Sequence, residues 1–236
     1  MDIIKKFILA AALMAPTLHA AAQTQDTYRS EERPDSVVMT ADSSFIRHFF
    51  VQPQIGVAFT RGENSFGKLL SPGAQFTVGY TFNPTWSARV GITGWQAKGN
   101  ALYDFQNHPY KFNFIQLSAD AMMDWVNLIW GWNKDRKLTS YILLGAGAND
   151  RFHNNEALDL YAVGYPFRHI WDGHKWSFIG RTGIGGNYRF SKVVDFNAEF
   201  NVTGLSDHFN SKYGHGGNID WQFNLLLGAT LHIGGY

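Results

Sequence analysis

The sequence has no cysteine, few charged residues and no long apolar run beyond its first 22 residues. The absence of cysteine excludes disulfides, thiolate zinc sites and cysteine nucleophiles. Charged residues make up only 17% of the 236 residues and the formal net charge is +1, so we expect no nucleic-acid partner. Without apolar runs of about 18 residues, the chain is not a bundle of membrane-spanning helices. Its length fits one domain, or a large one with a tail.

Residues 1–22 have the pattern of a Sec signal peptide. Lys5 and Lys6 supply the charged start, and Phe7 to Met14 form the apolar stretch. A small-residue cleavage site follows at Ala20 to Ala22. The apolar stretch is shorter than a bilayer-spanning helix, which disfavours the alternative of a permanent membrane anchor.

Residues 23–48 differ in composition, with several acidic and basic side chains and few large apolar ones. Such a segment cannot bury enough apolar surface to fold by itself. We expect a polar, poorly ordered leader between the signal peptide and a folded domain at residues 49–236.

From Phe49 onward, apolar and polar residues alternate, as they do in a strand whose two faces meet different environments. The segment from Trp221 to Ile233 is the clearest, with apolar residues at every odd position. Eight segments are strand-like, each about ten residues long, which is the length that a tilted strand needs to cross a bilayer. They are 51–60, 74–82, 86–93, 115–125, 138–148, 177–190, 194–203 and 221–233. In the glycine-rich segment 138–148, the sequence leaves open which residues face which side.

The connections between these segments alternate in length. Those at 82–86 and 191–193 are tight and the one at 126–137 is of medium length, whereas 62–71, 97–111, 149–175 and 204–217 are long. An even number of strands, with short turns on one side and long loops on the other, is typical of outer-membrane barrels of Gram-negative bacteria. We therefore predict an all-β, eight-stranded antiparallel up-and-down transmembrane barrel. Its four long loops would face outside, and the 23–48 leader would lie in the periplasm.

Aromatic residues gather near the ends of the predicted strands, and rings with one wet edge suit the lipid headgroup level. We expect an aromatic girdle made of Phe82, Trp86, Trp125, Trp130, Trp132, Trp176, Phe190 and Trp221. For any single one, an ordinary core or turn position is the alternative. The partners of such a girdle are outer-membrane lipid and lipopolysaccharide.

Seven charged residues share the polar side of the strands, namely Arg89, Asp120, Asp124, Arg181, Arg189, Asp195 and Glu199. A soluble lipocalin-type barrel would have its faces reversed, with these charges in water. Glycine shares the same side, which suits a narrow, crowded lumen. Eight strands leave room only for side chains, and buried charges must be paired. We expect a network of ion pairs in the lumen and no open pore.

Four segments of the chain are FNPTWSARVG from Phe82 to Gly91, DWVNL from Asp124 to Leu128, LGAG from Leu144 to Gly147 and VDFNAEF from Val194 to Phe200. They resemble the small eight-stranded barrel domain of OmpA-like outer-membrane proteins, in particular the versions common in Bacteroidetes. The resemblance covers roughly residues 49–236, and it implies a barrel in the outer membrane and no particular ligand.

The chain departs from the OmpA-like pattern at its C-terminus. Full-length members carry a peptidoglycan-binding domain, and we expect none here because the sequence stops at Tyr236 after the last predicted strand. The family's barrels usually end in an aromatic residue that the barrel-assembly machinery is thought to read, which makes this machinery an expected partner. Tyr236 falls on the polar side of its strand, and a bulge at Gly234 and Gly235 would restore the phase.

Catalytic residues are not evident. Some small barrels modify lipids, which requires a hydroxyl, a base and an acid close together. Ser206, Asp207 and His208 are consecutive, so their side chains cannot converge on one strand. His174 and Ser177 form a second pair without an obvious acid in the sequence. We expect a protein that is not an enzyme.

Histidines gather in the long connections, as His108, His153, His169, His174, His208 and His215. Imidazole binds zinc, copper and haem iron. However, no pair has a tight ligand spacing such as His-x-x-x-His, and histidines in polar loops usually have no ligand. We expect no metal and no cofactor.

The connection 149–175 is the best candidate for a recognition surface, because loops this long are usually functional or disordered. Its aromatic residues suit contact with an unknown extracellular partner, and they are Phe152, Tyr161, Tyr165, Phe167 and Trp171. The sequence thus favours a barrel that supports envelope integrity or surface interaction through its loops. A narrow porin-like channel for ions or small solutes is the alternative, and a lipid-modifying enzyme is third.

Overall fold

The computed structural model describes residues 45–60, 70–103, 106–165, 167, 170–206 and 219–234. The strands are β1 His48–Thr60, β2 Leu70–Thr81, β3 Trp86–Tyr103, β4 Gln106–Asp124, β5 Leu138–Phe152, β6 Lys175–Arg189, β7 Val194–Ser206 and β8 Ile219–Ile233. The helices are α3 Trp125–Trp130 and α4 Asn155–Ala162. The expected signal peptide lies outside the described residues, as does nearly all of the expected leader.

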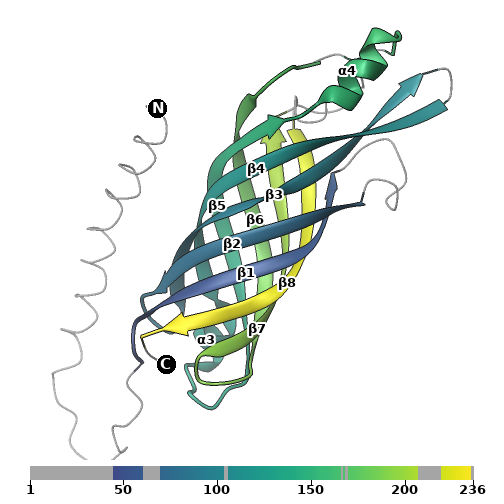
Figure 1. Ribbon diagram of the computed structural model, residues 1–236. Helices are drawn as coiled ribbons and strands as arrows, with labels where there is room; N and C mark the ends of the chain where they lie inside the picture. The colour runs from purple at the N-terminus through teal and green to yellow at the C-terminus, as the bar shows by residue number, and fades with distance from the viewer. Residues whose placement is uncertain are drawn as a thin grey trace, which may run out of the picture. The chain divides into compact units, whose positions relative to one another are not determined.

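The strands form a closed barrel in chain order, and every neighbouring pair is antiparallel (Figure 1). The predicted all-β, eight-stranded antiparallel barrel is confirmed. β1 and β8 close it, with pairs from Phe49 with Ile233 to Thr60 with Gln222. This closing ladder is interrupted at Gln52 and Pro53, and proline has no N–H to donate.

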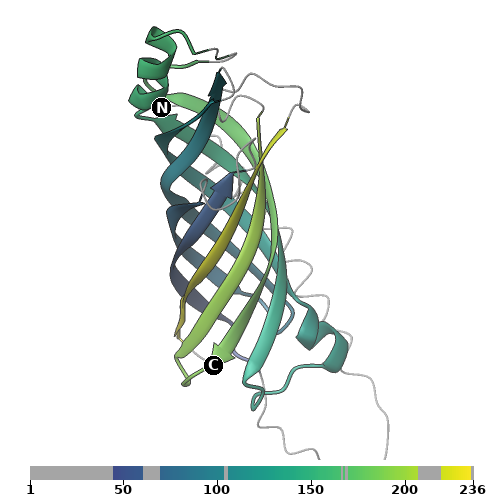
Figure 2. The same ribbon diagram turned by 90° about the vertical axis from the view of Figure 1, so that its right-hand side faces the viewer.

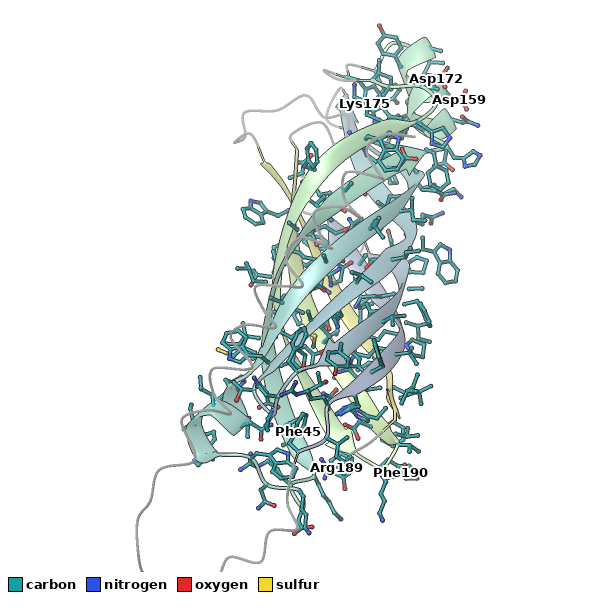
Figure 3. The ribbon with its side chains drawn as sticks, turned by 90° about the vertical axis from the view of Figure 1, so that its left-hand side faces the viewer. Phe45, Asp159, Asp172, Lys175, Arg189 and Phe190 are labelled. Carbon is teal, nitrogen blue, oxygen red and sulfur yellow. The ribbon has the colours of Figure 1, made fainter. Side chains whose placement is uncertain are left out.

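The barrel has two different ends. One, here called the turn end, carries the connections β2–β3, β4–β5 and β6–β7, together with the start of β1 and the end of β8. The other, here called the loop end, carries the remaining four connections. Figure 3 shows Phe45, Arg189 and Phe190 at the turn end, and Asp159, Asp172 and Lys175 at the loop end.

The outer surface of the barrel wall is apolar and the lumen is largely polar. Large apolar side chains are exposed on every strand, among them Ile55, Phe76, Ile92, Leu117, Leu144, Ile184, Phe200 and Leu227. Their sequence neighbours point inward and are buried, among them Gln54, Gln75, Gln116 and Asn201. This distribution excludes the soluble alternative, in which the apolar face would be inside.

The segment 138–148, whose facing the sequence left open, is now assigned. In β5, Tyr141 and Leu143 are buried and point inward.

The segment 97–111 is not a loop, so that expectation is wrong. β3 and β4 both continue through it and pair as far as Tyr103 with Gln106. The alternation persists here, with Ala97, Tyr110 and Phe112 buried. β3 pairs with β2 only up to Trp95, so the two strands leave the barrel as a ribbon, seen in Figure 1.

The ribbon leaves the barrel at a strained residue. Trp95 has φ 147°, which is unusual for a residue other than glycine. Trp95 pairs with the buried Phe114, and cross-strand partners normally share a face. The ring of Trp95 is nevertheless 58% exposed. The unusual backbone thus turns this indole from the lumen side to the outer surface.

Both helices lie in connections where none was expected. In α3, the Asp124 side chain caps the first turn by accepting from the Asn127 N–H at 2.7 Å. α4 lies at the loop end, where Ala157 is fully buried. Within the described ranges, no helix is long and apolar enough to span a bilayer.

Aromatic rings inside the barrel lie directly over glycines of the neighbouring strand. Tyr141 pairs with Gly185, and a Cβ atom at Gly185 would lie 2.2 Å from Cζ of the Tyr141 ring. The same arrangement occurs at Gly79 under Phe50. Glycine is required at these positions because the ring occupies the space of a side chain.

Replacing Gly185 with alanine is expected to destabilise the barrel by about 1–3 kcal/mol, the usual penalty for overpacking. The Tyr141 ring cannot move aside freely because its hydroxyl is hydrogen-bonded to Glu199. Gly180→Ala is the matched control, since a methyl group at this outward position of the same strand meets no atom within 4 Å. Urea unfolding in detergent micelles measures both variants, and equal stabilities would contradict the packing argument.

Candidate functional site: the filled lumen

Four charged side chains meet at the middle of the lumen, here called the charge cluster: Arg89, Asp120, Arg181 and Glu199. Arg89 binds Glu199 through a fork, with Nη1 to Oε2 at 2.8 Å and Nη2 to Oε1 at 2.9 Å. Its Nε donates to Oδ2 of Asp120 at 2.9 Å. Such bidentate, charge-assisted contacts are the strongest hydrogen bonds that proteins make.

Arg181 completes the charge cluster. Its Nη2 lies 3.3 Å from Oε1 of Glu199, and its Nε lies 3.4 Å from Oδ1 of Asp120. The cluster therefore holds two positive and two negative groups. Each of the four side chains is at most 1% exposed. Formal neutrality is what makes this burial tolerable, because an unpaired charge here would cost several kcal/mol.

Neutral polar side chains extend the charge cluster to every strand of the barrel. Gln75 on β2 accepts from Arg181 at 2.9 Å, and Gln52 on β1 accepts from Arg89 at 2.9 Å. From β5, the hydroxyl of Tyr141 donates to Glu199 at 2.8 Å. β8 joins through Thr230, which accepts from Gln52 at 2.8 Å. The lumen is thus crossed by one connected set of hydrogen bonds.

Three of the seven expected network residues lie elsewhere, at the turn end. Asp124 caps α3 as described above. The Arg189 side chain donates to the backbone carbonyl of Lys134. Asp195 accepts from Nε2 of His232 at 3.0 Å. The structure therefore brings Arg89, Asp120, Arg181 and Glu199 together and separates the other three from them.

A histidine pair lies beside Asp195. Nδ1 of His48 is 2.8 Å from the carbonyl of Ile46, and Nε2 of His48 is 2.9 Å from Nδ1 of His232. The carbonyl only accepts, so Nε2 of a neutral His48 must accept from His232. On its other side, His232 contacts Asp195 through Nε2 at 3.0 Å, so the two histidines and the carboxylate form one chain of polar contacts. The three residues border a cavity of about 100 Å³.

The loop end of the lumen holds an apolar layer, and the buried guanidinium of Arg151 lies 5.6 Å from the centre of the Trp171 ring beside it. It consists of Ala97, Tyr110, Phe112, Phe114, Ile179 and Leu205 from the barrel strands and the β3–β4 ribbon, packed with Ala157 and Trp171 from the β5–β6 connection. Trp171 meets Phe112 edge-on with ring centres 5.9 Å apart. The lumen thus gains an apolar layer toward this end, with the buried Arg151 as its charged neighbour.

The five aromatic residues proposed for recognition lie in different environments, and most of them are not exposed. Trp171, Phe167 and Tyr165 pack onto the apolar layer or its edge, with Phe167 edge-on to Tyr110 at 5.5 Å. Phe152 stacks on His174 at 5.6 Å. Only Tyr161 on α4 is largely exposed, at 52%. Three of the five therefore pack inward, and one is presented to the surroundings.

The girdle residues fall at two levels. Trp86, Trp130 and Phe190 are exposed near the turn end, with Phe82 and Trp125 partly exposed beside them, whereas Trp176 and Trp221 are exposed toward the loop end. Trp132 differs, because its ring packs edge-on against Phe45 at 5.8 Å and borders the cavity at the turn end. Trp95 and Phe178 are exposed toward the loop end and were not expected there.

The candidate catalytic groups do not assemble. Nδ1 of His174 lies 2.7 Å from Oδ2 of Asp150, which supplies the acid that the sequence did not reveal. The hydroxyl of Ser177, however, is buried without a hydrogen-bond partner. Asp207 and His208 lie outside the described residues, as do His169 and His215. Within the described part, no three histidine, aspartate or glutamate side chains are grouped to hold a metal ion.

Sequence reasoning missed the neutral members of the lumen network, above all Gln52, Gln75 and Tyr141. Gln52 and Gln75 were placed on the polar side of their strands, but nothing in one sequence shows which strands face each other across the lumen. Tyr141 lay in the segment of ambiguous facing. Its pairing with Gly185, which makes room for the ring inside the barrel, is fixed only by the register of β5 and β6.

Comparisons with known proteins bear on the fold alone. No family model and no curated protein matches the chain. Among solved structures, the chain is similar to outer membrane protein OprG from Pseudomonas aeruginosa, with a TM-score of 0.50 and 11% identity over 78% of this chain and 95% of that one. It is also similar to Neisserial surface protein A, with a TM-score of 0.49 and 13% identity over 78% and 96%. The fold is that of small outer-membrane barrels.

Replacing either Arg89 or Glu199 with methionine is expected to destabilise the barrel by about 3–5 kcal/mol, because the charge cluster is left with one buried net charge that no opposite charge balances. The double variant is expected to be more stable than either single variant, since Arg181 and Asp120 remain as a neutral pair. Urea unfolding of all four proteins in micelles measures the cycle. Strictly additive losses would show that the two side chains do not act as a pair.

Proposed function

We propose that the protein is an outer-membrane barrel with a closed lumen, which supports envelope integrity or surface interaction and is not an enzyme. The observation that carries this proposal is the charge cluster, which fills the lumen with paired groups that are at most 1% exposed. An ion or solute would have to break these pairs to pass, because eight strands leave no space beside them.

Insertion into a membrane is supported by the outer surface of the barrel. Exposed apolar side chains on all eight strands would otherwise meet water, and two levels of exposed aromatic residues border them. A closed barrel leaves no strand edge within its wall unpaired, which is the condition for spanning hydrocarbon with strands. The outer membrane is the location in which bacteria use such barrels.

Surface interaction is supported by the loop end. α4 is held to the β3–β4 ribbon by Glu156, which accepts from the backbone N–H of Lys111 at 2.9 Å. This arrangement exposes Tyr161 at 52% and Val163 at 73%. Exposed apolar residues on an ordered element suit contact with an extracellular partner. Lipopolysaccharide, the barrel-assembly machinery and the Bacteroidetes resemblance remain predictions.

The competing functions make different demands on the same lumen. A narrow channel requires a continuous wet path, whereas both the charge cluster and the apolar layer lie across that path. A lipid-modifying enzyme requires a nucleophile beside the His174–Asp150 pair, and Ser177 forms no hydrogen bond to either residue. The closed barrel is therefore favoured over both.

The refolded protein in a planar lipid bilayer is expected to show no discrete conductance steps. Insertion is checked separately, by resistance of the barrel to denaturation in SDS without heating. A variant in which Arg89, Arg181, Asp120 and Glu199 are all alanine serves as the positive control, because removing the charge cluster opens space for water in the middle of the lumen. Reproducible steps from the unmodified, inserted protein would favour the channel.

A further inference from the structure

The connection between β4 and β5 turns apolar side chains outward. α3 has the sequence WVNLIW and none of its residues is buried. Leu128 is 56% exposed, and Ile129 and Trp130 are each 63% exposed. A helix on a water-facing surface normally has the opposite arrangement, with polar residues outside.

The polar residue of α3 faces the protein. The Asn127 side chain donates to the carbonyl of Pro84 at 2.8 Å and accepts from Nη1 of Arg136 at 2.7 Å. The first bond attaches α3 to the β2–β3 turn, and the second ties it to the segment that follows it in the chain. The polar groups are thus satisfied within the protein, and the apolar groups are left facing outward.

The apolar surface of α3 continues the outer surface of the barrel wall. Trp125 is fixed to β5 by its Nε1, which donates to Oγ of Ser140 at 2.9 Å. At the same end, Leu138 and Phe190 are also exposed. Figure 2 shows α3, at the lower right, beside the wall and not across the mouth of the lumen. A neighbour that covers α3 would therefore also cover the wall.

Basic residues follow α3 in the same connection and recur at the neighbouring β6–β7 turn. They are Lys134, Arg136 and Lys137 after α3, and Arg189 and Lys192 near the β6–β7 turn, here called the basic rim. The N–H of Arg189 donates to the carbonyl of Lys137 at 2.7 Å, which holds the two segments together. Lys134, Lys137 and Lys192 are exposed, and Asp135 is the one acidic residue of segments 131–137 and 189–193.

We propose that α3 and the basic rim bind the anionic phospholipid headgroups of the periplasmic leaflet. This inference rests on the proposed function, because it requires a barrel inserted with its turn end toward the periplasm. The apolar side chains of α3 would lie at the boundary between headgroups and acyl chains, with the basic groups at the level of the phosphates. A soluble partner fits less well, because the apolar surface of α3 continues into the lipid-facing wall.

The test uses the chain without the expected signal peptide, reconstituted in phosphatidylcholine vesicles. Trace amounts of spin-labelled phosphatidylglycerol or phosphatidylcholine report, by electron paramagnetic resonance, how strongly each lipid associates with the protein. We expect phosphatidylglycerol to associate at least about twofold more strongly, and high salt to remove the difference. The variant K134Q/K137Q/K192Q is expected to show no preference.

The matched control is K98Q/K111Q/K175Q, which removes three lysines from the loop end and is expected to keep the preference. Because the chain has no cysteine, a single Ile129→Cys variant can also carry a spin label. Its label is expected to be more accessible to oxygen than to a water-soluble nickel complex.

Each outcome has a defined meaning. A protein that does not insert overturns both the proposed function and this inference. An inserted protein with no preference for phosphatidylglycerol, or with a preference that the loop-end control abolishes equally, overturns this inference and leaves the barrel intact. A label on α3 that is more accessible to the nickel complex places the helix in water and also overturns it.

Discussion

The buried ion pairs among Arg89, Arg181, Asp120 and Glu199 are the interaction on which the rest of the structure depends. Their pairing requires β3, β4, β6 and β7 to hold one register. A slip of one residue in any of these strands would move its charge to the apolar outer surface. The ion pairs can therefore form only when the strands are in the observed register, the barrel is closed and the lumen is filled.

The same barrel has three chemically distinct levels. The middle of the lumen is a neutral set of charges, the loop end is an apolar layer, and the turn end holds the paired histidines His48 and His232. In the proposed closed barrel, the first two levels would form the barrier to passage. The elements with exposed apolar side chains lie at the two ends of the barrel, α4 at the loop end and α3 at the turn end. This division explains how a closed barrel can still present different surfaces to the two sides of a membrane.

The sequence contained most of the fold because strand periodicity is a local property. Alternation such as that from Trp221 to Ile233 is set by the chain itself and persists in the structure. The segment 97–111 was predicted as a long connection, although the buried Tyr110 and Phe112 continue the alternation into it. Pairing across the lumen was not predictable in detail, because Arg89 and Glu199 are 110 positions apart and meet only when the barrel closes. α3 was missed because its outward apolar side chains resemble strand ends.

The interrupted ladder at Pro53 gives the barrel a distinctive seam. Seven of its eight strand pairs join neighbours in sequence, so each can form as a hairpin or a short-range contact. The eighth joins the two ends of the barrel and also lacks a proline N–H. Its formation carries the largest loop-closure entropy, and only then does Gln52 reach Thr230. Closing is therefore expected to be the slow, cooperative step of folding, because the lumen side chains can reach their partners across the seam only when it forms.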